Sequence, residues 1–289
     1  MKDYYYGFDW KSAKKLILQA LMEDIGSGDV TSEKLIPAKQ ESKAKLILKE
    51  TSVIAGLKIY KYVFNLLDSK VKVILKSGDG IRYKKGKILA IMKGNTRNLL
   101  AGERLSLNII QRMSGIANSV YDLKKKLNNK TIKILDTRKT TPNFRIFEKL
   151  AVKIGGGVNH RFGLYDMILI KDNHINANNG ILNTLNVLKK IKNKLNLQIE
   201  IEVKSIKDFQ IIQKYGKGII DIVMLDNFDF KKIKKVVELN EQKFKIELSG
   251  GINSSNISNF KKIRGIDYIS SGSLTHSYRS TDISLDFNT

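Results

Sequence analysis

The sequence predicts an α/β protein in two parts, a mixed α/β segment followed by a parallel sheet with helices outside it. Three observations lead to this prediction. The first ~110 residues mix helical and strand patterns, whereas from about residue 115 short β-rich runs alternate regularly with helical stretches. Polar or glycine residues follow most of the later β-rich runs. The alternation indicates β-α units joined by crossover helices.

The first part begins with an amphipathic pattern over Trp10–Met22, which predicts a helix that ends at the turn sequence Gly26–Asp29. Ser42–Glu50 and Val71–Leu75 alternate apolar and polar residues and predict half-buried strands. Apolar residues recur at helical spacing over Leu99–Met113, so we expect a helix there.

The second part predicts six strands and four helices in alternation. A closed or nearly closed (β/α) barrel is the first choice, and an open doubly wound sheet is the second. We expect the strands at Ile132–Leu135, Met167–Ile170, Ile199–Val203, Ile222–Leu225, Lys245–Leu248 and Asp267–Ile269, and the helices at Ile181–Leu195, Ile206–Tyr215, Phe230–Asn240 and Ser255–Lys262.

Polar residues stand where each predicted strand ends. One such group is explained as a turn or a helix cap, but six in the same position favour a pocket, because active sites of barrels lie at these ends. The last two groups are rich in glycine and serine, which suits a phosphate. The groups are Asp136–Lys139, Lys171–Asn173, Glu200 with Glu202, Asp226–Asn227, Ser249–Gly251 and Ser271–Ser273.

Cations gather in one region of the chain. The sequence has 43 Lys spread throughout but only nine Arg, and five of these fall between Arg104 and Arg161. The run Glu148–Ile175 contains a glycine triplet, two of the three histidines, Arg161 and Lys171. Because the planar fork of Arg binds carboxylate or phosphate bidentately, this region predicts recognition of an oxyanion.

Composition bounds the remaining possibilities. The net charge of +24 raises the question of nucleic acid, but the Lys residues are dispersed and no DNA- or RNA-binding motif is visible. Cysteine is absent, which excludes disulfides and thiolate sites. No apolar run of membrane-spanning length and no export signal is recognisable, so we expect a cytoplasmic protein without a membrane partner.

Several blocks of the sequence resemble the quinolinate phosphoribosyltransferases, the decarboxylating nicotinate-nucleotide pyrophosphorylases of NAD synthesis. Blocks in the right order and at the right intervals make this a specific signal. They are EDIGSGDVT (Glu23–Thr31), AGERLSLNIIQRMSGIA (Ala101–Ala117), LDTRKTTPNFR (Leu135–Arg145), the run Glu148–Ile175, LDNF (Leu225–Phe228), SGGI (Ser249–Ile252) and DYISSGSLTHS (Asp267–Ser277).

The resemblance implies roles for the residues that match. Quinolinate would contact Arg104, Thr137, Arg138, His160, Arg161 and Lys171. Phosphoribosyl pyrophosphate would contact Lys139, Lys171, Glu202, Asp226, Ser249, Gly250, Gly251, Ser271, Gly272 and Ser273. Lys139, Lys171, Glu202 and Asp226 would be the catalytic residues, with Mg²⁺ held, directly or indirectly, by Glu202 and Asp226.

The family implies an N-terminal α/β sandwich domain followed by an incomplete (β/α) barrel. We expect the sandwich at residues 1–112, the barrel at 113–275 and a tail, 276–289, that returns to the first domain. Arg104 would enter the active site of the partner subunit in a homodimer, with higher oligomers left open. The reaction would transfer phosphoribose to quinolinate with decarboxylation, giving nicotinate mononucleotide, CO₂ and pyrophosphate.

Alternatives remain at three points. Glu200 and Glu202 alternate onto the same face of their strand, so only the resemblance favours Glu202. A same-family homologue with another anionic substrate, of the type associated with molybdate transport, is the nearer rival. Keeping Arg104, Arg138, His160, Arg161 and Lys171 together argues against it. A basic nucleic-acid-binding protein is the farther rival.

Overall fold

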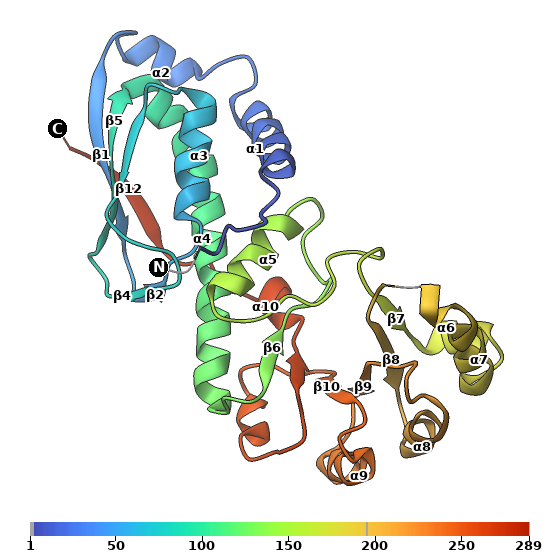
Figure 1. Ribbon diagram of the computed structural model, residues 1–289. Coiled ribbons are helices and arrows are strands. Elements are labelled where there is room, and N and C mark those ends of the chain that lie inside the picture. The colour runs from blue at the N-terminus through green and yellow to red at the C-terminus, as the bar shows by residue number, and fades with distance from the viewer. Residues whose placement is uncertain (1–2, 195, 289) are drawn as a thin grey trace. The chain divides into compact units, whose positions relative to one another are not determined.

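The computed structural model describes residues 3–194 and 196–288, which form two compact units (Figure 1). The first unit holds the chain up to residue 121, residues 140–157 and the chain from residue 274. The second holds residues 122–139 and 158–273. The expected boundary between residues 112 and 113 falls inside a single helix, α4 (Thr96–Leu127).

The first unit is built on a four-stranded antiparallel sheet in the order β12-β1-β5-β3. Along β1, Ala44, Leu46 and Leu48 are buried in alternation with more exposed residues, as expected for a strand with one face on the core. Helices α3 and α4 lie along this face and complete the core (Figure 1). The strands are β12 (Ile283–Asn288), β1 (Glu41–Leu48), β5 (Ile88–Asn95) and β3 (Lys72–Leu75), and α3 spans Leu57–Leu67.

The C-terminal strand β12 lies beside β1, with Leu285 opposite Leu46. Both side chains are buried in the same core. The last segment of the chain therefore belongs to the sheet that the first part builds. Residue 289, at the end of the expected tail, lies outside the described residues.

The predicted first helix is confirmed as α1 (Trp10–Ile25), where the Asp9 carboxylate accepts a hydrogen bond from the Ser12 backbone at 3.0 Å. The predicted turn at Gly26–Asp29 leads into a short helix that Asp29 caps in the same way. The remaining elements of this unit are α2 (Val30–Leu35), β2 (Ser52–Val53), β4 (Arg82–Tyr83), α5 (Arg145–Ile154) and α10 (Ser273–His276), the last of which begins at the end of the second unit.

The glycine triplet follows α5 as a loop. A Cβ on Gly155 would lie 2.5 Å from the Ala117 carbonyl oxygen of α4, so only glycine allows the two helices to approach this closely. Helix α5 was not predicted, and its first turn buries Glu148, which forms an ion pair with Arg112.

The second unit is a parallel sheet of six strands in the order β6-β11-β10-β9-β8-β7. Each strand from β7 to β11 pairs with its neighbour in the chain, and the first strand, β6, pairs with the last, β11. A closed barrel would also pair β6 with β7, but no such pairing exists among the described residues, where Val158 instead bridges to Leu135 of β6. The sheet is thus a barrel left open between its first two strands, as expected.

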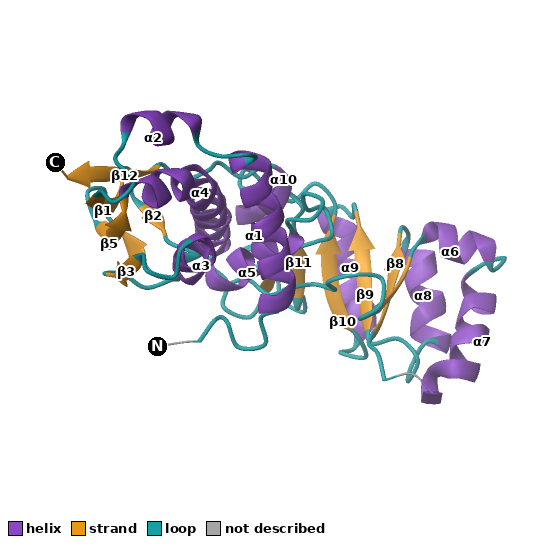
Figure 2. Ribbon diagram, turned by 90° about the horizontal axis from the view of Figure 1, so that it is seen from above, coloured by secondary structure: helices purple, strands orange, loops and turns teal. Residues whose placement is uncertain are grey.

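The strands lie close to their predicted positions, and β8 matches its prediction at both ends. They are β6 (Lys133–Leu135), β7 (Ile168–Ile170), β8 (Ile199–Val203), β9 (Ile222–Asp226), β10 (Lys245–Ser249) and β11 (Tyr268–Ser270). The arrows of β8, β9 and β10 point the same way in Figure 2.

Helices α7 (Ile181–Ile191), α8 (Ile206–Tyr215) and α9 (Phe230–Asn240) pack in a row outside the strands, with α8 between the other two (Figure 1). The predictions for α8 and α9 are confirmed at both ends. The predicted helix to residue 195 ends at Ile191 and is followed by a 3₁₀ turn, η1 (Lys192–Lys194), while residue 195 lies outside the described part.

The predicted helix at Ser255–Lys262 is wrong, because this segment forms only the 3₁₀ turn η2 (Ile257–Phe260). The Asn253 side chain accepts from the Ser255 backbone, and Asn256 accepts from the Asn253 backbone. Short polar side chains that bond to the backbone in this way compete with helical hydrogen bonds. Across residues 3–194 and 196–288, no helix has both the length and the apolar composition of a membrane span.

Candidate active site

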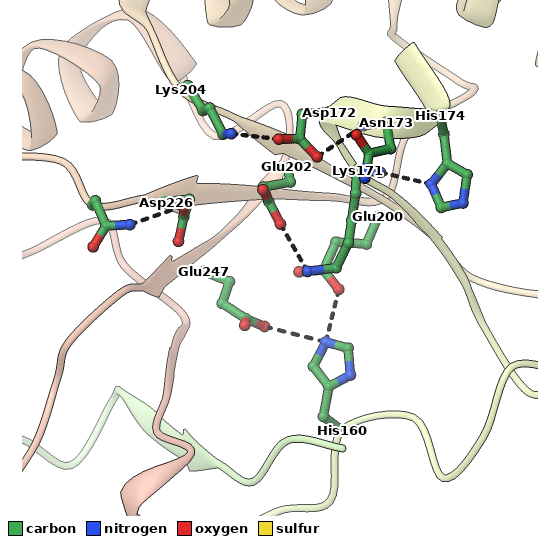
Figure 3. A network of polar contacts seen from close by, with 11 residues as sticks. His160, Lys171, Asp172, Asn173, His174, Glu200, Glu202, Lys204, Asp226 and Glu247 are labelled. Atoms are coloured by element: carbon green, nitrogen blue, oxygen red, sulfur yellow. Dashed lines mark hydrogen bonds and ion pairs between the residues drawn. The ribbon is translucent and has the colours of Figure 1, made fainter. Parts of the chain in front are cut away.

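The carboxyl ends of β7 and β8 bring a lysine and an acid together. Lys171 follows β7, and its ammonium group donates to Oε2 of Glu202 near the end of β8 at 3.1 Å (Figure 3). The Lys171 side chain is 48% exposed and that of Glu202 is 8% exposed. This ion pair at the sheet edge leaves the ammonium group accessible to a ligand.

The backbone of Lys171 is held from two sides. Lys171 caps the short helix α6 (Asp172–Ala177), and its N–H donates to Nδ1 of His174 at 3.0 Å. Lys204, just after β8, donates to Asp172 in the first turn of α6 at 2.5 Å. The hydrogen bond from Lys204 lowers the pKa of Asp172, and the same contact raises the pKa of Lys204. These contacts fix the position from which the Lys171 side chain projects.

Two carboxylates on neighbouring strands offer oxygen ligands for a hard cation. β8 and β9 are paired, so Glu202 and Asp226 lie close to the same edge of the sheet. Asp226 is half-buried, and its Oδ2 accepts from the Asn227 side chain at 2.9 Å. Mg²⁺ prefers carboxylate oxygens, and it is commonly bound by one or two carboxylates together with substrate phosphates. The donor set therefore fits Mg²⁺.

Arg138 and Arg161 form a second cationic region of the same unit. Burial lowers the pKa of Arg161, and the positive charge of the nearby Arg138 lowers it further. Arg161 also donates to the Met167 carbonyl at 3.5 Å. Because like charges repel, a bound anion between two such guanidinium groups would be strongly favoured.

His160 is tied to the interior of the sheet. Its Nε2 lies 2.8 Å from Oε2 of Glu200 and 3.7 Å from Oε2 of Glu247, on β8 and β10 (Figure 3). Its Nδ1 accepts the Arg161 backbone N–H at 2.8 Å. Its own backbone N–H donates to Asp136 at 2.9 Å. The side chain is only 8% exposed.

Glu200 and Glu247 are both fully buried, and burial raises the pKa of each above the ordinary value. The negative charge of Glu200 raises the pKa of Glu247 further. If both side chains are ionised, Oε1 of Glu200 and both carboxyl oxygens of Glu247 are buried without a hydrogen-bond donor. Two adjacent buried carboxyl groups resist ionising together, which favours a proton on one of them.

His160, Glu200 and Glu247 also have the composition of a metal site, with ligand atoms within 4.8 Å of one another. The histidine argues against this use. A metal-bound imidazole normally donates from its other nitrogen, but Nδ1 of His160 accepts a backbone N–H. Nε2 must then carry the proton of the neutral ring and cannot bind a metal. The hydrogen bond of this cluster is the one between Nε2 of His160 and Oε2 of Glu200.

The two loops rich in glycine and serine follow β10 and β11. Gly250 has φ +102°, and a Cβ there would lie 2.2 Å from the Asn227 side-chain oxygen, so this loop is built for glycine. The Ser271 hydroxyl donates to the Ile252 carbonyl at 2.6 Å and lies 2.8 Å from the Ser273 hydroxyl. Ser271 therefore ties the two loops together.

The structure places the other predicted residues as follows. Thr137 accepts from the Lys139 backbone at 3.0 Å in the loop after β6. Ser249 ends β10 opposite Asp226. Gly251 has φ +60°, and Gly272 precedes α10. The exception is Arg104, which is exposed on α4 of the first unit, whereas the other predicted site residues lie in the second unit.

Sequence reasoning missed the supporting residues Lys204 and Glu247, and it placed Asp136 at a strand end without giving it a partner. Asp136 is fully buried and binds both the His160 backbone and the Asn159 side chain, the latter at 2.6 Å. The sequence does indicate that Glu247 is unusual, because it is an acid between two apolar residues of a predicted strand, Ile246 and Leu248. The partner of such an acid is not visible in sequence.

Comparison with known proteins identifies the family. The family described as quinolinate phosphoribosyl transferase, N-terminal domain, matches residues 29–114, and its C-terminal domain matches residues 116–286. A probable nicotinate-nucleotide pyrophosphorylase (carboxylating) of Bacillus subtilis is 42% identical over 273 residues, covering 94% of this chain and 92% of the relative.

Solved structures agree. The crystal structure of NadC from Streptococcus pyogenes has a TM-score of 0.91 at 36% identity and covers all of both chains. The nicotinate-nucleotide pyrophosphorylase from Francisella tularensis has a TM-score of 0.89 at 34% identity, covering 96% of each chain. With both domain families matched in order along most of the chain, this protein belongs to the quinolinate phosphoribosyl transferase family.

Proposed function

We propose that this chain transfers the phosphoribosyl group of phosphoribosyl pyrophosphate to the ring nitrogen of quinolinate and releases CO₂, giving nicotinate mononucleotide and pyrophosphate in NAD biosynthesis. The observation that carries the proposal is the grouping of Arg138, Arg161 and Lys171 with the acids Glu202 and Asp226 in one unit. Cations suit a dianionic acceptor, and acids suit the metal of a pyrophosphate donor.

Quinolinate binds through the cations. Each charge-assisted hydrogen bond from Arg138, Arg161 or Lys171 to a carboxylate contributes roughly 1.5–3 kcal/mol net. The neighbouring positive charges of Arg138 and Arg161 supply two planar forks for a small dianion. Thr137, whose hydroxyl orders the turn at Lys139, shapes the same loop.

Phosphoribosyl pyrophosphate binds across the ends of β8 to β11. Lys139 and Lys171 face its charged groups, Glu202 and Asp226 hold Mg²⁺ or the ribose hydroxyls, and the two glycine-serine loops take the 5-phosphate. Mg²⁺ would offset the negative charge of the pyrophosphate group. The backbone N–H groups near Gly250, Gly251 and Gly272 can donate to the phosphate, and glycine has no side chain that would block its approach.

The chemistry requires positioning and charge rather than a nucleophile. As pyrophosphate leaves, the ribose gains oxocarbenium character, and the negative charge of the Glu202 carboxylate would offset the positive charge that develops. The cations keep the ring nitrogen of quinolinate in line with the anomeric carbon. Once the new bond forms, the positively charged ring accepts the electrons that the departing CO₂ leaves behind.

The active unit is a homodimer in this proposal, with Arg104 of each subunit completing the other subunit's site. The exposure of Arg104 on α4 supports this role, because its guanidinium is available to a partner subunit. The cytoplasmic location expected from the sequence stays a prediction.

Mass spectrometry of the products tests the function. Incubation with quinolinate, phosphoribosyl pyrophosphate and Mg²⁺ is expected to give nicotinate mononucleotide and CO₂, and chelation of Mg²⁺ is expected to stop the reaction. Nicotinate in place of quinolinate is the control for the carboxylate that is lost. Absence of product with quinolinate, with product from another aromatic anion, would favour the homologue of different specificity. Tight DNA retention on filters at moderate salt would favour the nucleic-acid alternative.

A further inference from the structure

We propose that Lys204 is a further substrate-binding residue of this site, and that its ammonium group binds the pyrophosphate end of phosphoribosyl pyrophosphate. The inference rests on the proposed function, because it extends the set of residues that would hold that substrate. The geometry that points to it is a row of three residues at the carboxyl edge of the sheet, in which Lys204 stands beside Asp226 and Ser249.

The first step concerns the place of Lys204 on the sheet. Val203, the last residue of β8, is paired with Leu225 of β9. The next residues of these two segments are Lys204 and Asp226, and Asp226 is paired in turn with Ser249 of β10. Because residues in register on parallel strands lie at the same level, a cation, an acid and the first residue of a glycine-serine loop form one row.

The second step concerns the charges around Lys204. Its ammonium group donates to Oδ2 of Asp172 at 2.5 Å, and Figure 3 shows Glu202 and Asp226 in the same group of polar side chains. The hydrogen bond to Asp172 raises the pKa of Lys204, and the negative charges of Glu202 and Asp226 raise it further. Lys204 is thus a cation within electrostatic reach of both acids that would hold Mg²⁺.

The third step concerns the availability of the ammonium group. An ammonium group has three N–H donors, and among the described residues that of Lys204 donates only to Asp172. The side chains of Lys204 and Asp172 are 56% and 44% exposed, and an ion pair this exposed contributes little to stability. A phosphate oxygen can therefore accept from the other donors, or replace Asp172, at small cost.

The fourth step identifies the part of the substrate that Lys204 would bind. Mg²⁺ is commonly held by one or two carboxylates together with substrate phosphates, so Mg²⁺ at Glu202 and Asp226 would bring the pyrophosphate group to these acids. The loops that would take the 5-phosphate follow β10 and β11, whereas Lys204 follows β8, on the other side of β9. Lys204 is therefore placed for the pyrophosphate group, and its charge would offset the negative charge of that leaving group.

Loss of the positive charge tests the assignment. Lys204→Met keeps a long side chain and removes the ammonium group, so calorimetry should show Mg²⁺–pyrophosphate binding weakened about fivefold or more. Ribose 5-phosphate and quinolinate should bind within about twofold of the unsubstituted protein. Lys207→Met, at an exposed position in the first turn of α8, is the matched control for loss of one positive charge. Unchanged pyrophosphate binding, or an equal loss for ribose 5-phosphate, would overturn the proposal.

A double-mutant cycle with Asp172→Asn separates direct binding from an effect through α6. If the ammonium group binds pyrophosphate, Lys204→Met should weaken binding by the same factor in the presence of Asp172→Asn. If Lys204 served only to hold Asp172 in place, its loss would weaken binding by less than about twofold in that background, and the proposal would be overturned.

Binding of Mn²⁺ alone, as a probe for Mg²⁺, gives a readout of the opposite sign. Lys204 repels a cation at Glu202 and Asp226, so electron paramagnetic resonance should show that Lys204→Met binds Mn²⁺ at least as tightly as the unsubstituted protein. Weaker Mn²⁺ binding would mean that the substitution disturbs the two acids, and would overturn the proposal.

The same proteins distinguish failure of this inference from failure of the proposed function. If the unsubstituted protein forms nicotinate mononucleotide and Lys204→Met binds Mg²⁺–pyrophosphate normally, only the role of Lys204 is lost. If the unsubstituted protein binds neither Mg²⁺–pyrophosphate nor phosphoribosyl pyrophosphate, the proposed function and the role of Lys204 are both overturned.

Discussion

Glu200 and Glu202 project from the same face of β8, two residues apart, yet they have different partners. Glu200 is fully buried and lies 2.8 Å from Nε2 of His160, whereas Glu202 is 8% exposed and pairs with Lys171 at 3.1 Å. Side chains two residues apart on a strand lie on the same face, so both acids do. They differ because Glu202 is nearer the carboxyl end of the strand. We therefore infer that Glu202 faces the ligand and that Glu200 belongs to the interior.

Loss of an acid at the sheet edge should weaken binding of phosphoribosyl pyrophosphate more than binding of quinolinate. Asp226→Ala is expected to weaken binding of Mg²⁺–phosphoribosyl pyrophosphate at least about tenfold, ~1.4 kcal/mol, with a smaller effect on quinolinate. Separate calorimetric titrations measure this. Glu238→Ala, an exposed acid on α9, is the control for loss of one negative charge. Equal losses for both ligands would indicate general damage and count against the metal role.

The cationic region should depend on the shape of the arginine as well as its charge. Arg161→Lys keeps the positive charge but loses the planar fork, so quinolinate affinity should fall at least about tenfold, ~1.4 kcal/mol. Arg264→Lys, at an exposed position, is the matched control. Unchanged affinity of the Arg161 variant would remove its carboxylate-binding role.

A shared active site makes a sharp prediction for mixed dimers. Arg104→Ala and Lys171→Ala are each expected to be nearly inactive. In a mixed dimer one site carries both lesions and the other carries neither, so up to about a quarter of the wild-type activity should return at statistical mixing. The measurement is activity after subunit exchange, followed independently by mass. Confirmed exchange without recovered activity would contradict the proposal that Arg104 acts across the interface.

The buried acid pair should make stability depend on pH. Burial raises the pKa of Glu247 to about 8 in the folded protein, so between its ordinary pKa and that value the folded state holds a proton that the unfolded state has lost. Stability should therefore fall as pH rises from 5 to 8, by up to ~1.4 kcal/mol per pH unit for one proton.

Glu247→Gln removes this proton while keeping the shape of the side chain, so its dependence on pH should be flatter. Thermal or urea unfolding of both proteins at pH 5 to 8 measures the difference. Parallel curves for the variant and the unsubstituted protein would show that Glu247 does not titrate in this range.

The loop after β10 should not tolerate a side chain at its first glycine. Gly250→Ala places a methyl group 2.2 Å from the Asn227 oxygen, so the loop must shift, and KM for phosphoribosyl pyrophosphate should rise about tenfold or more. Gly251→Ala meets no atom within 4 Å and is the matched control for a residue of positive φ. Equal effects of the two substitutions would mean that backbone conformation, and not the contact with Asn227, is the constraint.

Local pattern was sufficient for much of the second unit. The bounds of β8, α8 and α9 agree with their predictions. In a buried parallel strand or an amphipathic helix, the apolar residues follow a pattern that is visible in the local sequence. The strand-end positions of Lys171, Asp226 and Ser249 followed from the same periodicity. The helix predicted at Ser255–Lys262 is wrong because hydrogen bonds from the backbone to the side chains of Asn253 and Asn256 outweighed a weak helical pattern.

The sequence by itself thus determined the alternation of strands and helices over most of the second unit, the family, and the residue types at each strand end. The tertiary structure decided which of those residues meet. No local pattern could show that β6 pairs with β11, that Glu247 lies beside His160, or that the His160 ring accepts the Arg161 N–H. These contacts join distant segments or depend on the rotation of one side chain. They form because polar atoms that are buried by the fold need hydrogen-bond partners.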